Sequence, residues 1–139
     1  MRKLPDYPLW LGSAVDMHDL RTVLSEGIEA VVDLAMNEPV PLVTRDLVYC
    51  RFPLLDGAGN DSRVLRIALH TTAELLRRDV KTLVYCSAGM SRTPAVAAGA
   101  LALGFGLTFE SARSLVAANA PVDISPTLLS DIHRLLLPS

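Results

Sequence analysis

The sequence has few of the residues that build cross-linked or metal-bound proteins. Only two cysteines, Cys50 and Cys86, occur in 139 residues, which is too few for a disulfide framework. The three histidines, His18, His70 and His133, are scattered, and neither they nor the cysteines show the spacing of metal ligands. We therefore expect reduced thiols, no metal or other cofactor, and a cytoplasmic location.

Long apolar runs and an excess of one charge are also absent. The longest stretch without a charged residue covers residues 93–109, and its 17 residues would span about 26 Å as a helix, less than the roughly 30 Å of a bilayer's hydrocarbon core. The first eight residues lack the apolar run of a signal peptide. The formal net charge of −2 gives no general attraction to nucleic acid or to an anionic membrane. We expect a monomer that binds neither nucleic acid nor membrane.

The residues that are present suit one compact domain. Of these, 50% are hydrophobic and 20% are charged, so we assign residues 1–139 to a single domain with one buried core. Short runs rich in Val, Leu, Tyr and Phe predict strands at residues 9–11, 30–35, 47–53 and 82–86. Apolar periodicity and capping residues predict helices at residues 16–25, 62–78, 92–103, 108–118 and 126–136. This alternation predicts an α/β fold with a central, mostly parallel sheet of about four or five strands flanked by helices.

One segment carries most of the chemistry. Residues 84–94 read Val-Tyr-Cys-Ser-Ala-Gly-Met-Ser-Arg-Thr-Pro, and they follow a predicted buried strand and open a predicted helix. A tight loop in that position can direct successive backbone N–H groups inward, and the helix N-terminus adds partial positive charge. We therefore predict a phosphate-binding loop formed by Ser87, Ala88, Gly89, Met90, Ser91 and Arg92.

Cys86 stands at the base of this loop, and Arg92 follows six residues later. The groups that would hold a phosphate dianion also stabilise a thiolate, so we predict that Cys86 acts as a nucleophile. Arg92 can bind two phosphate oxygens through its planar guanidinium group. The alternative for this segment is a buried structural cysteine beside a helix-capping turn.

In these residues the sequence resembles the dual-specificity branch of the protein tyrosine phosphatase superfamily, whose loop reads His-Cys-x-x-Gly-x-x-Arg followed by Ser or Thr. Residues 9–14, 27–34 and 121–136 also resemble the family's opening strand, second strand and closing helical segment. The resemblance implies a metal-independent phosphatase that forms a phosphocysteine intermediate. It also implies a phosphorylated protein or peptide as substrate, and the lack of Lys or Arg at loop positions 87, 88, 90 and 91 favours such a substrate over polyanionic ones.

The resemblance assigns two further roles. The family's general acid is an aspartate about thirty residues before the cysteine, and Asp56 lies 30 residues before Cys86. From the pattern alone, Asp56-Gly57 is better explained as a turn dipeptide; with the resemblance, Asp56 is the preferred acid and Asp61 the second candidate. Thr93 is expected to donate a hydrogen bond to the sulfur, and its alternative is an ordinary residue of the first helical turn.

Tyr85 departs from the family pattern, which has a histidine before the cysteine. A phenol can donate a hydrogen bond but carries no positive charge, so we expect an active enzyme with a less stabilised thiolate. Cys50 is predicted to be a buried strand residue, with a disulfide to Cys86 as the weaker alternative. Competing functions are a phosphate-binding module without turnover, a phosphatase of non-protein esters, and a sulfurtransferase or arsenate reductase that also uses a cysteine loop.

Overall fold

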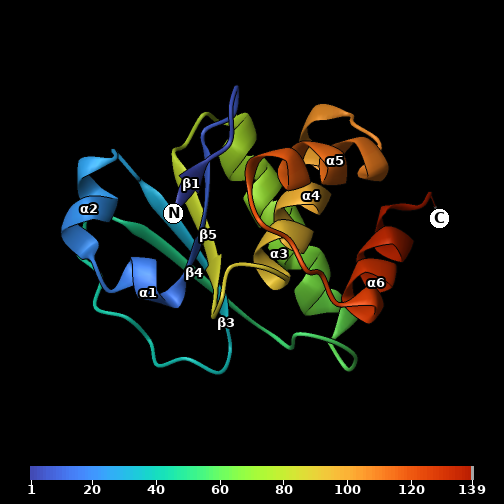
Figure 1. Ribbon diagram of the computed structural model, residues 1–139, viewed down its shortest axis with the longest axis horizontal. Coiled ribbons are helices and arrows are strands. Elements are labelled where there is room, and N and C mark those ends of the chain that lie inside the picture. The colour runs from blue at the N-terminus through green and yellow to red at the C-terminus, as the bar shows by residue number, and fades with distance from the viewer. Residues whose placement is uncertain (139) are drawn as a thin grey trace.

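The computed structural model describes residues 1–138 and places a five-stranded sheet at the centre of the molecule (Figure 1). The strands are β1 (Arg2–Lys3), β2 (Leu9–Ser13), β3 (Ala30–Ala35), β4 (Val48–Leu54) and β5 (Thr82–Cys86), in the spatial order β1-β2-β5-β3-β4. Neighbouring strands run parallel except β1, which pairs antiparallel with β2. The predicted α/β fold with a mostly parallel sheet is confirmed.

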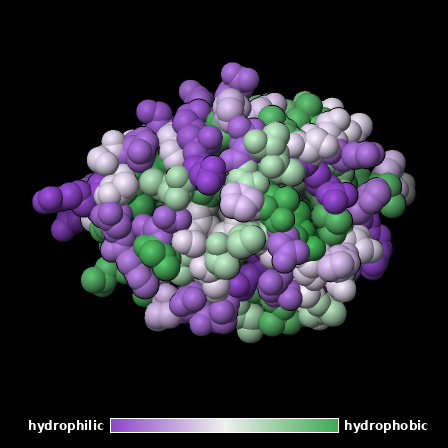
Figure 2. Space-filling model, in the orientation of Figure 1, coloured by the Kyte–Doolittle hydropathy of each residue, from purple (hydrophilic) through white to green (hydrophobic). Residues whose placement is uncertain are grey.

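Helices cover both faces of the sheet (Figure 1). On one face lie α1 (Ala14–Met17) and α2 (Leu20–Ser25), and on the other lie α3 (Ser62–Arg77), α4 (Arg92–Phe105), α5 (Phe109–Asn119) and α6 (Pro126–Leu136). Figure 2 shows hydrophilic and hydrophobic residues interspersed over one face of the molecule. No helix within residues 1–138 is long and apolar enough to cross a membrane.

Two predicted helix boundaries are wrong. The helix expected at residues 16–25 is divided in two, because Asp19 begins a new helix by accepting a hydrogen bond from the backbone N–H of Thr22. The helix expected to end before Gly104 continues beyond it. The chain turns at Gly106 instead, where a φ of 67° gives the left-handed conformation that ends many helices.

β5 is buried along its whole length, and its side chains alternate between two cores. Val84 and Cys86 pack in the core on the α3–α6 side, whereas Leu83 and Tyr85 pack in the core formed with α1 and α2. Cys86 and Tyr85 therefore point to opposite faces of the sheet.

The loops that follow β3, β4 and β5 leave the same edge of the sheet, because these strands run parallel and lie side by side. Sites in open α/β sheets form at the carboxyl ends of the strands for this reason. The three loops carry Asn37, Asp56 and residues 87–91. The fold thus brings together side chains that are far apart in the sequence.

Candidate active site

The segment between β5 and α4 forms a tight loop around the sulfur of Cys86. The backbone N–H of Gly89 donates a hydrogen bond to the Cys86 sulfur over 3.3 Å. Gly89 has a φ of +77°, and a Cβ at this position would lie 2.7 Å from the carbonyl oxygen of Gly12. Only glycine fits this close approach without strain, so the loop shape depends on that residue.

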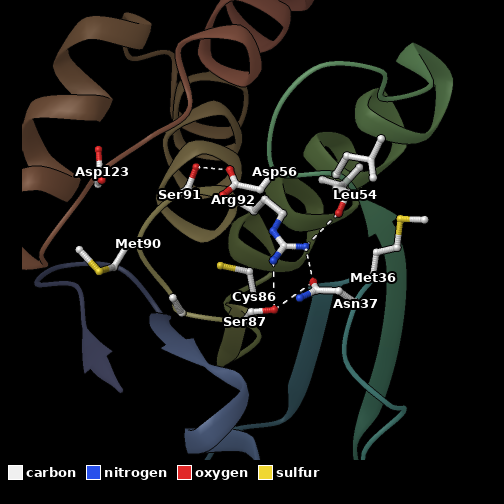
Figure 3. A pocket seen from close by; sticks show the side chains of 12 residues that line it. Met36, Asn37, Leu54, Asp56, Cys86, Ser87, Met90, Ser91, Arg92 and Asp123 are labelled. Carbon is white, nitrogen blue, oxygen red and sulfur yellow. Dashed lines mark hydrogen bonds between the residues drawn. The ribbon is translucent and has the colours of Figure 1, made fainter.

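An open pocket of about 650 Å³ lies above this loop (Figure 3). The pocket is lined by side chains from the loops after β3 and β4, from the segment of residues 86–92, and from the segment that precedes α6. Cys86, Arg92 and Asp56 all line it, so the segment that holds Cys86 and Arg92 shares one cavity with Asp56, which lies 30 residues before Cys86.

Arg92 is the first residue of α4 and is only 6% exposed. Its Nη1 donates to the backbone oxygens of Leu34 and Leu54, at 3.3 and 3.0 Å, and to Oδ1 of Asn37 at 3.0 Å. Its Nη2 donates to the hydroxyl of Ser87 at 3.1 Å. Because Nη1 carries most of these bonds, the guanidinium is fixed and keeps donor capacity on Nε and Nη2 for an oxyanion.

Asn37 is a site residue that the sequence reasoning missed. Its Oδ1 accepts hydrogen bonds from both Arg92 and the Ser87 hydroxyl, each at 3.0 Å (Figure 3). Arg51 holds the loop on which Asn37 lies, because its Nη2 donates to the backbone oxygens of Ala35, Met36 and Glu38 at 3.2 to 3.4 Å. Asn37 therefore joins this loop to the predicted phosphate-binding loop.

Asp56 enters the pocket from the loop that follows β4. Its Oδ1 accepts a hydrogen bond of 2.5 Å from the hydroxyl of Ser91, which itself accepts one of 2.9 Å from the backbone N–H of Ser125. The Asp56 carboxyl group is therefore held beside the predicted phosphate-binding loop, and it lines the same pocket as Cys86.

Asp61, the second candidate acid, has a different place. It caps the N-terminus of α3, accepting a hydrogen bond of 2.9 Å from the backbone N–H of Arg63. Hydrogen bonds from the Arg63 side chain lower the pKa of Asp61 to about 2. Asp61 does not line the pocket, so of the two candidates only Asp56 is placed with Cys86.

Thr93 is fully buried behind the loop. Its hydroxyl donates to the backbone oxygen of Gly12 at 3.4 Å, while the hydrogen bond recorded at the Cys86 sulfur comes from Gly89. The hydrogen bond expected from Thr93 to the sulfur stays a prediction.

Tyr85 lies beside a buried polar cluster on the opposite face of the sheet from Cys86. Asp33 is fully buried there and accepts hydrogen bonds from the hydroxyl of Tyr49 at 2.5 Å and from Arg51 at 3.4 Å. Burial raises the pKa of Tyr85 above its ordinary value, and the neighbouring Asp33 carboxylate acts in the same direction. Tyr85 is therefore neutral at physiological pH and contributes no charge behind the loop.

The structure contradicts the alternative of a disulfide between Cys50 and Cys86. Cys50 pairs in register with Val32 of β3, and Val32 pairs with Val84 of β5, so Cys86 lies two strands away. Neighbouring strands are about 4.8 Å apart, which puts the two Cα atoms roughly 10 Å apart or more, beyond the limit of about 7 Å for a disulfide. Cys50 is a half-buried strand residue, and its burial raises the pKa of its thiol.

No family model and no curated protein sequence matches the chain. Solved structures do match it along nearly its whole length. Human DUSP28 superposes with a TM-score of 0.84 at 23% identity, covering 96% of this chain and 94% of that one. The chain has the dual-specificity phosphatase fold.

Other structures with this fold agree. The human tyrosine phosphatase-like serine/threonine/tyrosine-interacting protein gives a TM-score of 0.83 at 18% identity, covering 97% of this chain and 94% of that one. A mouse putative dual specificity phosphatase complexed with zinc tungstate gives 0.81 at 21% identity, covering 94% and 86%. At these identities the likeness concerns the fold, and the chemistry of the pocket must be argued from its own residues.

Proposed function

We propose that the chain is a cysteine-dependent protein phosphatase of the dual-specificity type, which hydrolyses phosphate monoesters on proteins or peptides. Solved phosphatases of this type with the same fold support the proposal. The observation that carries it is the presence of Cys86, Arg92 and Asp56 in one pocket. A nucleophile, an oxyanion-binding cation and a proton donor are the three groups that this hydrolysis requires.

The phosphate dianion would bind in the loop formed by residues 86–92. The backbone N–H groups of Ser87 to Arg92 and the N-terminus of α4 supply positive potential without a metal. Arg92 adds a bidentate pair of donors from a side chain whose orientation is already fixed. These groups stabilise the charge that develops on the equatorial oxygens as the phosphoryl group is transferred.

The reaction would proceed in two steps. In the first, the Cys86 thiolate attacks phosphorus, the bond to the ester oxygen breaks, and Asp56 protonates the departing oxygen. In the second, Asp56 accepts a proton from water as the water oxygen attacks phosphorus and the phosphorus–sulfur bond breaks. The hydrogen bond from Ser91 orients Asp56 in both steps. Thr93, the second residue of α4, would donate a hydrogen bond to the departing thiolate.

A second candidate function is a binding module that holds phosphorylated partners without hydrolysing them. Two observations favour it. The chain has the same fold as the human tyrosine phosphatase-like serine/threonine/tyrosine-interacting protein, with a TM-score of 0.83, and Tyr85 behind the loop is neutral. Phosphate esters outside proteins are a further possible substrate class for the same chemistry. Release of inorganic phosphate separates a module from an enzyme, and the relative rates on peptide and non-peptide esters separate the two kinds of substrate.

The proposal is tested by incubating the purified chain in EDTA with p-nitrophenyl phosphate and with a phosphotyrosine peptide. We expect phosphate release from both, unchanged by the chelator, since every proposed group belongs to the chain. Binding of the phosphopeptide without any release of phosphate would establish the binding module instead.

Asn37→Ala should lower kcat/KM for p-nitrophenyl phosphate about tenfold, because Arg92 and Ser87 lose a shared acceptor and fewer hydrogen bonds hold the guanidinium in place. The matched control is Glu38→Ala, because Glu38 contributes only its backbone oxygen to Arg51 and the substitution keeps that oxygen. We expect Glu38→Ala to stay within about twofold of wild type. Equal activities of the two variants would show that Asn37 does not position Arg92.

Tyr85→His should increase the rate at which iodoacetate alkylates Cys86 at neutral pH, because a histidine beside the buried Asp33 carries positive charge behind the loop. Tyr85→Phe removes the hydroxyl but introduces no charge, so its alkylation rate should match wild type within about twofold. A faster reaction in Tyr85→Phe than in Tyr85→His would show that packing, and not charge, sets the reactivity of the thiol.

A further inference from the structure

Three large apolar side chains are exposed at the mouth of the pocket. Met36 is 48% exposed, Leu55 41% and Met90 40%, and all three line the cavity. They come from the loops after β3, β4 and β5, and Figure 3 shows Met36 and Met90 at opposite sides of the opening. We call Met36, Leu55 and Met90 the apolar rim. Single exposed apolar residues are ordinary on protein surfaces, whereas several gathered around one cavity mark a binding surface.

Charge around the pocket is distributed unevenly. Arg92 is the only lysine or arginine among the lining residues, and it lies at the base, 6% exposed. The exposed Asp123 also lines the pocket, and its backbone N–H donates to the backbone oxygen of Met90 at 2.7 Å. A second anionic group on a bound ligand would therefore meet the Asp123 carboxylate beside the rim, with no cation to pair it.

The volume of the pocket leaves room for contacts beyond the phosphate. At about 650 Å³ it is in the range of sites that enclose drug-sized ligands, and a phosphate group in the loop would occupy only its base. The rest of a bound ligand must then pass between the side chains of the rim. Methionine adapts its shape to varied apolar partners, and two of the three rim residues are methionines.

We propose that the apolar rim selects singly phosphorylated sites whose flanking residues are apolar, and that it discriminates against sites flanked by acidic residues. This inference rests on the proposed phosphatase function and names the substrate class within it. Apolar flanks bury surface against Met36, Leu55 and Met90, which favours binding. Acidic flanks lose that burial and are repelled by Asp123.

The test compares three phosphotyrosine peptides of equal length that differ only in the residues on either side of the phosphotyrosine, which are leucine, serine or glutamate. For wild type we expect kcat/KM to be at least about tenfold higher with leucine than with glutamate, and serine to lie between them. The variants Met36→Ser, Leu55→Ser and Met90→Ser should each reduce the ratio of leucine to serine peptide by about two- to threefold. The readout is this ratio, in which a change common to all substrates cancels.

The matched control is Ile67→Ser, which removes an apolar side chain that is 54% exposed on α3 and does not line the pocket. We expect it to keep the wild-type ratio. Equal kcat/KM values for the three peptides, or ratios that the rim substitutions leave unchanged, would overturn the inference while the phosphatase function stands. A preference for the glutamate peptide would overturn it as well.

The proposed function can fail separately. If wild type releases phosphate from none of the peptides, the phosphatase proposal is wrong, and the rim is then judged by binding. Dissociation constants of the same three peptides with the Cys86→Ser variant should follow the same order, leucine tightest and glutamate weakest. Equal constants would remove the selective role of the rim.

Discussion

Cys86→Ser should reduce phosphate release by at least about 10⁴-fold, the largest effect that we expect of any single substitution. A serine hydroxyl stays protonated near neutral pH and is a far weaker nucleophile than a cysteine sulfur. Cys86 is 2% exposed and serine is the smaller residue, so the loop should keep its shape. The change is measured as kcat for p-nitrophenyl phosphate in EDTA.

Cys50→Ser is the matched control, since it makes the same substitution at the other cysteine. It should retain activity near wild type, because Cys50 lies two strands from Cys86 and does not line the pocket. Cys86→Ser should still bind a phosphopeptide, because Arg92 and the loop amides remain. Comparable losses in both variants would point to folding and not to the removal of a nucleophile.

Asp56→Asn should lower kcat by about 10² to 10⁴-fold, because the protons of an amide are far too weakly acidic to be transferred to the departing oxygen. The loss should be greater for phenyl phosphate than for p-nitrophenyl phosphate, since the nitrophenolate leaves readily without protonation. Asparagine can keep the hydrogen bond from Ser91, so the loop geometry should be preserved. The measurement is kcat for the two esters across a pH series, in which the variant should lose the limb that reports the protonated acid.

Asp61→Asn is the control for this substitution. Asparagine caps a helix about as well as aspartate, so α3 should keep its N-terminus, and the pocket does not include this residue. Activity should stay within about twofold of wild type. A larger loss from Asp61→Asn than from Asp56→Asn would move the general acid to Asp61.

Much of the site could be predicted from the sequence because its central part is local. Cys86 and Arg92 are six residues apart, and the strand, loop and helix that place them are continuous in the chain. Gly89 lies between them, and the sequence does not reveal why a glycine is needed there, which is that the backbone of Gly89 passes close to the carbonyl oxygen of Gly12. Asp56 was ambiguous from its dipeptide pattern, and the resemblance and then the pocket favour it as the acid.

Other features depend on contacts that no local pattern records. Asn37 contacts Arg92, which lies 55 residues later in the sequence, and the two meet only because β5 inserts beside β3 at the centre of the sheet. The strand β1 has two residues and exists through its pairing with β2, so its own sequence carries little signal. The division between α1 and α2 has a local signal in the sequence. Asp19 is a residue type that often caps helices, and its side chain accepts a hydrogen bond from the backbone N–H of Thr22, three residues later.

The most direct test of nucleophilic attack by Cys86 is to trap the covalent intermediate. Asp56→Asn leaves no base to activate water in the second step, so a phosphorylated enzyme should accumulate with p-nitrophenyl phosphate, whose leaving group needs little help in the first. After rapid acid quenching and proteolysis, mass spectrometry should find one phosphoryl group on the peptide that contains Cys86, and none in Asp56→Asn combined with Cys86→Ser. The mechanism would be contradicted if wild type turns over p-nitrophenyl phosphate while Asp56→Asn shows no phosphoryl group on Cys86, or if activity survives in Cys86→Ser.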